Sequence, residues 1–494
     1  MPTHRANTPL PAWLTDFRKQ LGAELVETHI SWLLLSERYA YKIKKPVCLP
    51  FLDYGAPAKR EFFCNEELRL NRRLAGGLYV DVVPVAGTTE WAVRMHRFDE
   101  SSRLDHVCAA NTLTRDHVTQ LARTLADFHA QTDVAPHSSD FGSAAAVSRA
   151  VKRNFVQLRA VLPDHLVEID ALEQWMDQQL SSLAGAIESR KEMGRVRECH
   201  GDLHLANMVL IGGKVVPFDC IEFDESLRWI DVVSEVAFVY MDLVAHQRPD
   251  LALWLLDQWL EVTGDFDGVR LLRFYAAYRA QVRAMVAAMS AQWQVAATYL
   301  QTALIMQTLP ALHLTITFGV SGSGKSVASA RRLLADAAAM TVRVHSDIER
   351  KRLYGYTALE RTGSSLSGGI YTVEAGERTY ARLAVIAHEL LAAGWSVIVD
   401  ATFLQRCDRQ AFRSIAGAHD AGFSILACDA PQEELQRRIA TRTGDASEAL
   451  VAVLAHQLRT IEPLSDDELS YLDSDSGVQI AVPPAPTFDA LSGT

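Results

Sequence analysis

The first hundred residues alternate hydrophobic and polar positions with the period of two that is typical of β-strands. Five strands are predicted, at 25–30, 31–36, 39–44, 79–85 and 90–98. A short helix falls within residues 1–20, and helical spacing returns over 59–74. Together these elements predict a small mixed sheet accompanied by one long helix.

Helical periodicity then dominates. Hydrophobic residues recur at helical spacing from 113 to about 190 and again from Trp229 to Thr308. Between these regions, two short strands at 208–211 and 214–218 flank Gly212-Gly213, which is a two-residue hairpin signal.

From residue 314 onward, short hydrophobic runs alternate with helical segments. The runs lie at 314–318, 341–346, 396–399, 424–428 and 478–482. Strands separated by helices predict a parallel, doubly wound sheet, and ligands bind at the carboxyl ends of such strands. The whole chain is therefore expected to form two domains, an α+β domain followed by an α/β domain.

The composition sets further limits. A chain of 494 residues is too long for one hydrophobic core, and its net charge of −11 argues against a surface that coats nucleic acid or anionic membranes. The seven cysteines are dispersed without a C-x-x-C pair, which favours reduced, buried thiols. With no apolar segment near Met1, we expect a cytoplasmic protein that does not bind membranes.

The run Gly319-Val-Ser-Gly-Ser-Gly-Lys-Ser326 follows a predicted strand and precedes a segment with helical spacing. Glycines allow successive backbone N–H groups to turn towards phosphate oxygens, so the run is typical of a phosphate-binding P-loop. We expect Lys325 to reach the outer phosphates and Ser326 to hold Mg²⁺. The predicted nucleotide-binding residues are Gly319, Ser321, Gly322, Ser323, Gly324, Lys325 and Ser326.

The glycine hairpin carries a second candidate site. A hairpin brings its outer ends together, so Asn207 and Asp219 should meet beside Asp202. Three oxygen-bearing side chains in one place suit Mg²⁺ and a phosphate donor.

His200-Gly-Asp202 and Asn207 have the spacing of the kinase catalytic loop H-R-D-x-x-x-x-N. We expect Asp202 to accept the proton of a substrate hydroxyl and Asn207 and Asp219 to hold metal. A zinc site built on His200 and His204 is an alternative, although no Cys or His pair completes a tetrahedron.

On these residues, 20–300 resembles the aminoglycoside phosphotransferase and choline kinase-like family. The resemblance implies a bilobal, protein-kinase-like fold with ATP in the cleft. It also implies that Lys42 contacts the ATP phosphates and that Glu67 is its partner on the helix. Lys44 and Glu66 remain alternatives, because each lies beside the favoured residue. The G-x-G-x-x-G loop is missing, so a less glycine-rich hairpin would cover the phosphates.

The same resemblance implies that Asp231 braces the catalytic loop. Arg279 and Arg283 lie one helical turn apart. They could line a pocket for an anionic acceptor, but a solvated helix face is the favoured interpretation.

In the last third, Asp347 and Asp400 each end a predicted strand, which places both near the P-loop. Asp347 would take a proton from an acceptor hydroxyl and Arg350 would orient the acceptor, whereas Asp400 would hold Mg²⁺ through water. A helix cap at Asp347 and strand-end packing at Asp400 are the alternatives. Arg438 and Arg442 share a helix face and could close over a transferring phosphoryl group, or simply be solvated.

Residues 313–482 resemble the P-loop kinases that include polynucleotide kinase, gluconate kinase and zeta toxins. The matching points are the P-loop, the Asp347…Arg350 pair, Val397-Ile-Val-Asp-Ala-Thr402 and the two lid arginines. The resemblance implies an α/β P-loop NTPase fold with a mainly parallel sheet, in which Asp347 is the base.

We therefore expect a kinase-like domain at 1–308, a P-loop kinase domain at 309–482 and a disordered tail at 483–494. The expected activity is bifunctional: each domain moves the γ-phosphoryl of ATP, with Mg²⁺, to a hydroxyl of a small molecule. One alternative is a 5′-hydroxyl polynucleotide kinase in the second domain, which Arg350-Lys-Arg352 permits and the net charge does not favour. Another is that one half only binds ATP and regulates the other.

Overall fold

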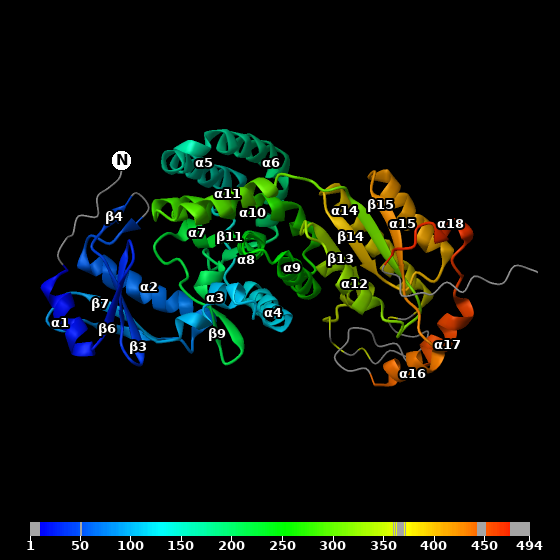
Figure 1. Ribbon diagram of the computed structural model, residues 1–494, viewed down its shortest axis with the longest axis horizontal. Coiled ribbons are helices and arrows are strands. Elements are labelled where there is room, and N and C mark those ends of the chain that lie inside the picture. Colours follow the sequence, from blue (N-terminus) through cyan, green and yellow to red (C-terminus); the bar gives the residue numbers. More distant parts are fainter. Residues whose placement is uncertain are drawn as a thin grey trace, which may run out of the picture. The chain divides into compact units, whose positions relative to one another are not determined.

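The computed structural model describes residues 10–49, 52–358, 360, 362, 370, 372–441 and 451–474 (Figure 1). The chain divides into two compact units. The first is formed from residues 1–310 with 336–339, and the second from residues 311–335 with 340–494. The strand expected at 478–482 and the tail expected at 483–494 lie outside the described residues.

A five-stranded antiparallel sheet begins the first unit, in the order β1-β2-β3-β7-β6. Its strands are β1 (Glu24–Glu27), β2 (Ser31–Leu35), β3 (Tyr39–Lys44), β6 (Tyr79–Pro84) and β7 (Trp91–His96). Helix α1 (Ala12–Leu21) packs Leu14 into a core with Trp32, Leu34 and Ile43. Helix α2 (Pro57–Ala75) packs against β6 and β7. A small pair missed by the sequence analysis, β4 (Cys48–Leu49) and β5 (Leu52–Asp53), is too short to give a periodic signal.

The rest of the first unit is mainly helical. Its longer helices are α3 (Leu104–Ala109), α4 (Arg115–Gln131), α5 (Ala144–Val161), α6 (Leu166–Glu192), α8 (Val232–Ala245), α9 (Pro249–Thr263), α10 (Val269–Met289) and α11 (Trp293–Ile305). Helix α8 is buried on nearly every side, as expected for a helix that is apolar all round. Helix α10 packs against α8, α11 and α5, while α4 packs against α9.

Two short sheets lie among these helices. The predicted glycine hairpin is β9 (Met208–Ile211) and β10 (Lys214–Pro217), and Gly212 and Gly213 have φ of +56° and +77°. Strand β8 (Val196–Glu198) pairs with β11 (Trp229–Asp231). The helix expected from Trp229 therefore begins three residues later, because the Asp231 side chain caps α8 by accepting the Val233 N–H.

The second unit contains a four-stranded parallel sheet in the order β13-β14-β12-β15. The strands are β12 (His313–Phe318), β13 (Thr341–His345), β14 (Ser396–Asp400) and β15 (Gly422–Ala427). Helices α12 (Lys325–Leu334), α14 (Val373–Ala392) and α15 (Arg406–Ala418) pack on the sheet. The remaining helices are α13 (Ser346–Leu353), α16 (Gln432–Ala440), α17 (Val451–Thr460) and α18 (Asp466–Leu469). The strand before the P-loop thus lies inside the sheet, between β14 and β15.

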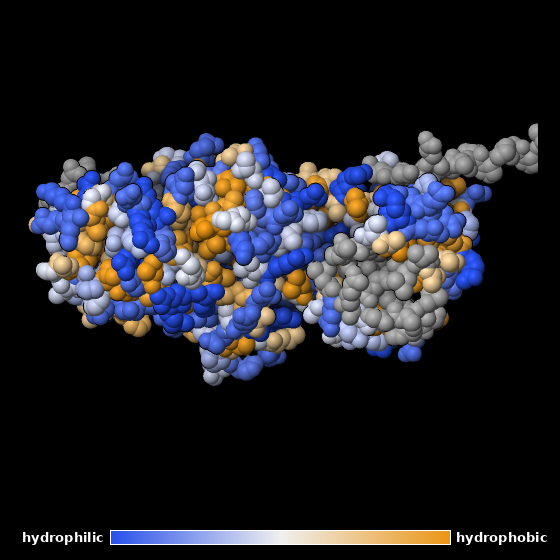
Figure 2. Space-filling view, turned by 90° about the horizontal axis from the view of Figure 1, so that it is seen from below, coloured by the Kyte–Doolittle hydropathy of each residue, from blue (hydrophilic) through white to orange (hydrophobic). Residues whose placement is uncertain are grey.

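Hydrophilic residues cover much of the face shown in Figure 2, with hydrophobic residues in small groups among them. Within the described part of the chain, no helix is both long and apolar enough to cross a membrane. All seven cysteines are unpaired, as expected. The expectation that they are buried is wrong for Cys48 and Cys407, which are exposed.

Candidate active sites

Two buried carboxylates of α8 hold the backbone of the loop that follows β8. Glu235 accepts hydrogen bonds from the backbone N–H groups of His200 and Gly201, the latter at 3.0 Å. Asp242 accepts the Leu205 N–H at 2.7 Å. Glu235 and Asp242 are seven residues apart, so they share one face of the helix. The loop is therefore fixed at both ends by charges placed inside the most apolar helix of the unit.

This arrangement corrects the expected role of Asp231. The Asp231 carboxylate pairs with the buried Arg190 at 2.7 and 2.9 Å and caps α8. Glu235, one helical turn further on, bonds to the loop instead. Sequence reasoning missed Glu235, although a charged residue in an apolar helix was a visible signal.

The His200 side chain connects this loop with the hairpin. Its Nε2 donates to the carbonyl of Phe218 at 2.9 Å, and its Nδ1 accepts the Asp202 N–H at 3.3 Å. Burial lowers the pKa of His200, which favours the neutral ring that this bonding pattern requires. His200 therefore positions the backbone on both sides of the site without carrying a charge.

Asp202 and Asn207 meet as the sequence predicted. The Asn207 amide nitrogen donates to the Asp202 carboxylate at 3.0 Å. Burial opposes the ionised form of Asp202, but His204, Arg283 and His200 together lower its pKa below the ordinary value. His204 Nε2 lies 3.4 Å from the carboxylate and 3.1 Å from the Arg283 guanidinium. Asp202 is thus an ionised carboxylate that can accept a proton through a hydrogen bond.

Asp219 follows the second hairpin strand and faces the sheet of the first unit. Its φ of +64° is unusual for a residue with a side chain, and its N–H donates to the Tyr79 hydroxyl at 3.2 Å. The carboxylate pairs with Lys42, which also lies 3.0 Å from Glu67. Burial alone would lower the pKa of Lys42, but Asp219, Glu67 and Glu222 raise it well above the ordinary value. Lys42 therefore stays charged at the centre of this cluster.

Lys44 lies behind Lys42 and is completely buried. It bonds to the second Glu67 oxygen at 2.8 Å and also pairs with Glu222, which in turn accepts the Tyr54 hydroxyl. Burial would raise the pKa of Glu67, yet Lys42 and Lys44 lower it to about 2. Both lysines contact Glu67, but only Lys42 reaches Asp219.

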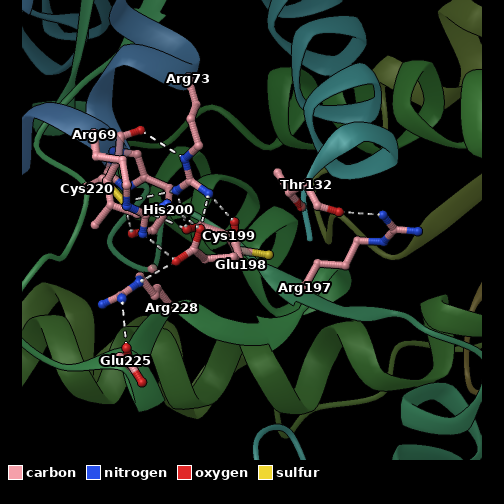
Figure 3. Close-up of polar contacts among 12 residues, drawn as sticks. Arg69, Arg73, Thr132, Arg197, Glu198, Cys199, His200, Cys220, Glu225 and Arg228 are labelled. Carbon is pink, nitrogen blue, oxygen red and sulfur yellow. Dashed lines mark hydrogen bonds and ion pairs between the residues drawn. The ribbon is translucent and has the colours of Figure 1, made fainter. Parts of the chain in front are cut away.

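Glu66 has a different set of partners. It pairs with Arg69 at 2.6 Å and with Arg228 at 3.2 Å. Arg69 and Arg228, together with Arg73, also surround the Glu198 carboxylate at 2.8–3.1 Å, as Figure 3 shows. These bonds tie α2 to the strand that leads into the His200 loop. Glu66 therefore belongs to a structural anchor, and Glu67 is the glutamate that faces the lysines.

Arg279 and Arg283 do not form the solvated face that the sequence favoured. Arg279 is 4% exposed and donates to the Gly201 carbonyl at 3.3 Å and to the Ser234 hydroxyl at 3.1 Å. The reason is that α10 packs between other helices, so most of its circumference is buried.

The donor set of the first unit fits a nucleotide with Mg²⁺. Carboxylate and amide oxygens are hard ligands, and Asp219 and Asn207 supply one of each. Because the Asn207 nitrogen is bonded to Asp202, its amide oxygen is left for a cation. Lys42 adds the positive charge that a phosphate chain needs.

The P-loop of the second unit has the backbone geometry that phosphate binding requires. Gly322 and Gly324 have φ of +84° and +97°. A Cβ at Gly319 would lie 2.2 Å from the Cys428 carbonyl oxygen, so no larger residue fits there. The Ser323 hydroxyl is buried, and the described residues give it no hydrogen-bond partner. Helix α12 begins at Lys325, so its N-terminal N–H groups add to this phosphate-binding cradle.

A cavity of about 620 Å³ opens beside the P-loop. Its lining includes the P-loop residues 321–326 and the predicted Asp347, Arg350, Asp400 and Arg438. Gln457, which accepts the Ser321 N–H at 2.8 Å, and Tyr380 also line it and were not predicted. The P-loop, Asp347 and Asp400 thus line one cavity, as expected for residues that follow the carboxyl ends of parallel strands. Arg442 lies outside the described residues.

The predicted charged side chains of this cavity make polar contacts within the second unit. Arg350 lies 3.0 Å from Asp347, and Arg438 donates to the Gly322 carbonyl at 3.2 Å. Asp347 lies in the first turn of α13 and is not its cap, because His345 occupies that position. Asp400 is buried and accepts the Ser329 hydroxyl at 2.9 Å. Its carboxylate is therefore part of the strand-end packing as well as of the cavity lining.

The basic run at residues 350–352, which permitted a nucleic-acid substrate, does not form a basic surface. Lys351 is 1% exposed, and Arg352 pairs with Glu349. Arg350 faces the cavity beside Asp347. The run therefore offers no row of exposed cations for a phosphate backbone.

Comparison with family models agrees with this geometry. Residues 57–272 match the model described as "Phosphotransferase enzyme family", and residues 314–464 match the model described as "AAA domain". The chain thus joins a domain that is similar to the phosphotransferase enzyme family to a P-loop domain with a parallel sheet.

Similar whole chains occur in mycobacteria. The "Uncharacterized protein Rv2004c" of Mycobacterium tuberculosis strain H37Rv and the "Uncharacterized protein Mb2027c" of Mycobacterium bovis are each 29% identical over 442 residues. The match covers 87% of this chain and 88% of each relative.

Among solved structures, the GDP and kanamycin complex of an aminoglycoside phosphotransferase, APH(2")-IIia, is 13% identical with a TM-score of 0.39. The match covers 60% of this chain and 98% of that one. An ethanolamine kinase of Plasmodium vivax is 9% identical with a TM-score of 0.38, over 58% of this chain and 82% of the other.

Proposed function

We propose that this protein is a tandem ATP-dependent phosphotransferase, in which each unit transfers the γ-phosphoryl group of ATP to a hydroxyl group of a small molecule. The observation that supports it best is the same in both units. A carboxylate suited to accept a proton lies beside a cation and oxygen ligands suited to a phosphate chain and Mg²⁺.

In the first unit, Asp202 takes the proton of the acceptor hydroxyl, and Asn207 orients the Asp202 carboxylate through its 3.0 Å hydrogen bond. Lys42, held by Glu67, contacts the phosphates of ATP. Asn207 and Asp219 would hold Mg²⁺, which would neutralise phosphate charge when bound. The Asp219 carboxylate that would hold the metal is the one that pairs with Lys42 in this structure.

In the second unit, the P-loop amides, Lys325 and Ser326 hold the phosphates and Mg²⁺. Asp347 is the base for the acceptor hydroxyl. Arg350, which lies 3.0 Å from Asp347, orients the acceptor. Arg438 reaches the P-loop backbone and neutralises charge on the transferring group.

The test is label transfer from γ-³²P-ATP by the full chain, with pools of metabolites, aminoglycosides and 5′-hydroxyl oligonucleotides as acceptors. The account predicts labelled small molecules in two sets, one lost in Asp202→Ala and the other in Lys325→Ala. Label in the oligonucleotides alone would replace the second activity with a polynucleotide kinase. Free phosphate as the only product of one unit would make that unit a regulatory module.

A further inference from the structure

A cavity of about 700 Å³ lies in the helical part of the first unit, and none of the predicted catalytic or nucleotide-binding residues lines it. Its walls come from residues 140–142 and α5, from the segment 226–231, from Ser234 of α8 and from α10. The volume is in the range of sites for drug-sized ligands. It therefore requires an explanation separate from ATP binding.

The charges on its walls do not cancel. Asp140 is paired with Arg149, and Asp231 is paired with Arg190. Arg153 and Arg279 also line the cavity, and among the described residues no carboxylate lies within ion-pair distance of either. Because Arg190 is shared between Asp231 and a second buried carboxylate, Asp265, the cavity surroundings carry one net positive charge.

Arg279 is the more informative cation because it is buried. It donates only to neutral oxygens, the Gly201 carbonyl and the Ser234 carbonyl and hydroxyl, at 3.1–3.4 Å. A buried charge without a counter-ion is costly, so an anion in the cavity would gain strongly from it.

The walls also carry aromatic rings. Phe141 and Trp229 stack with an interplanar angle of 9° and ring centroids 5.8 Å apart. Tyr275 and Tyr278 of α10 line the cavity as well, and the Arg279 guanidinium lies 5.3 Å from the Tyr278 ring. Aromatic walls favour planar, apolar ligand groups.

We propose that this cavity binds an anionic small molecule that carries a planar ring. The site adjoins the catalytic loop, because the Gly201 carbonyl that Arg279 contacts immediately precedes Asp202. The backbone of Leu227, another lining residue, also lies against Gly201, where a Cβ would be 2.7 Å from the Leu227 oxygen. A bound anion thus acts on the loop either as the acceptor or as an effector, and a polycation is disfavoured at this place.

The test uses two probes of the same shape, the anion 2-naphthoate and its neutral amide 2-naphthamide, titrated calorimetrically into the full chain without nucleotide. We expect saturable binding of 2-naphthoate about tenfold tighter than that of the amide, which corresponds to one uncompensated charge near the ligand. Arg153→Glu should weaken 2-naphthoate binding by about tenfold and leave the amide nearly unchanged.

Lys152→Glu is the matched control, because it makes the same charge change on an exposed neighbour in α5 that does not line the cavity. Equal affinity for both probes, no binding of either, or equal effects of the two charge reversals would overturn the proposal. Asp202→Ala should bind 2-naphthoate as the unmodified chain does, so failure of phosphotransfer is distinguishable from failure of this site.

A hydroxylated probe, 6-hydroxy-2-naphthoate, then separates the two roles when Mg²⁺ and labelled ATP are present. Label on its hydroxyl identifies the ligand class as the acceptor of the first unit. A change in ATP consumption without labelled probe identifies it as an effector. Absence of both effects despite binding would remove the link to the catalytic loop.

Discussion

The two candidate sites differ in the sequence separation of the residues that form them. The P-loop site is built around eight consecutive residues, and its key property is backbone conformation. The site of the first unit is built from side chains far apart in sequence, such as Lys42 and Asp219, which are separated by 177 residues. A local site depends on glycines and one helix end, whereas the assembled site depends on a buried network of charges.

This difference predicts different responses to mutation. In the proposed function, replacing a side chain in the P-loop removes a contact with phosphate and leaves the glycine conformations of the loop in place. Replacing a charge in the assembled site removes a contact and also leaves its former partner buried without a counter-ion.

The largest effect is expected for Asp202→Ala. Loss of the proton acceptor should lower the transfer rate of the first unit by about 10²–10⁴-fold and leave the second activity unchanged. The measurement is the initial rate of label transfer to each acceptor set. Asp116→Ala, an exposed acidic residue of α4, is the control and should change neither rate. Loss of both activities in Asp202→Ala would contradict independent sites.

Lys325→Ala should lower the second activity by about 10²–10³-fold, as expected when one preorganised electrostatic contact is lost. The first activity should stay at the level of the unmodified chain. Arg459→Ala removes an exposed positive charge from α17 and serves as the matched control. If both variants lost the second activity equally, the loss would be due to a change in net charge and not to a lost contact between Lys325 and phosphate.

Glu235→Gln tests the buried support of the assembled site. Removing this charge while keeping its shape should cost about 3 kcal/mol of the free energy of unfolding of the first unit, because His129 and the loop N–H groups lose their charged partner. Denaturant unfolding followed by tryptophan fluorescence measures the loss. Asp257→Asn, which changes a buried carboxylate of α9, is the control. Under conditions where both variants are fully folded, only Glu235→Gln should lower the transfer rate of the first unit.

The smallest effect concerns pH. Although burial opposes their ionisation, charged and hydrogen-bonding partners lower the pKa of Glu67 and of Glu235 to about 2 in the folded state, against about 4.3 for a glutamate in an unfolded chain. Their contribution to stability is therefore present above pH about 4.5 and is lost as the pH falls towards 2. Unfolding midpoints measured between pH 7 and 3 should fall, and Glu67→Gln should flatten that decline. The same substitution at the exposed Glu37 should leave its slope unchanged.

The contrast between the sites also sets the limit of what the sequence could predict. The strands, the hairpin and the P-loop follow from local patterns. The hairpin also places Asn207, which contacts Asp202, against Phe218, the residue before Asp219. Glu235 could have been found from its place in an apolar helix. Gln457 and Glu222 could not, since their roles depend on contacts with residues 136 and 178 positions away.

The choice between Glu66 and Glu67 shows the same limit. The two residues are adjacent and chemically identical, and only the packing of α2 decides which one faces the lysines and which one faces the arginines. The assignment of Arg279 failed for a related reason. When a helix packs on several sides, as α10 does, its hydrophobic periodicity does not show which polar positions are buried.

The central claim is that one chain contains two separate sites for ATP with Mg²⁺. Equilibrium binding of a non-hydrolysable ATP analogue to the full chain tests it most directly. The account predicts two bound nucleotides per chain, and one per chain in Lys325→Ala. One nucleotide per unmodified chain, with no transfer activity in either unit, would contradict it.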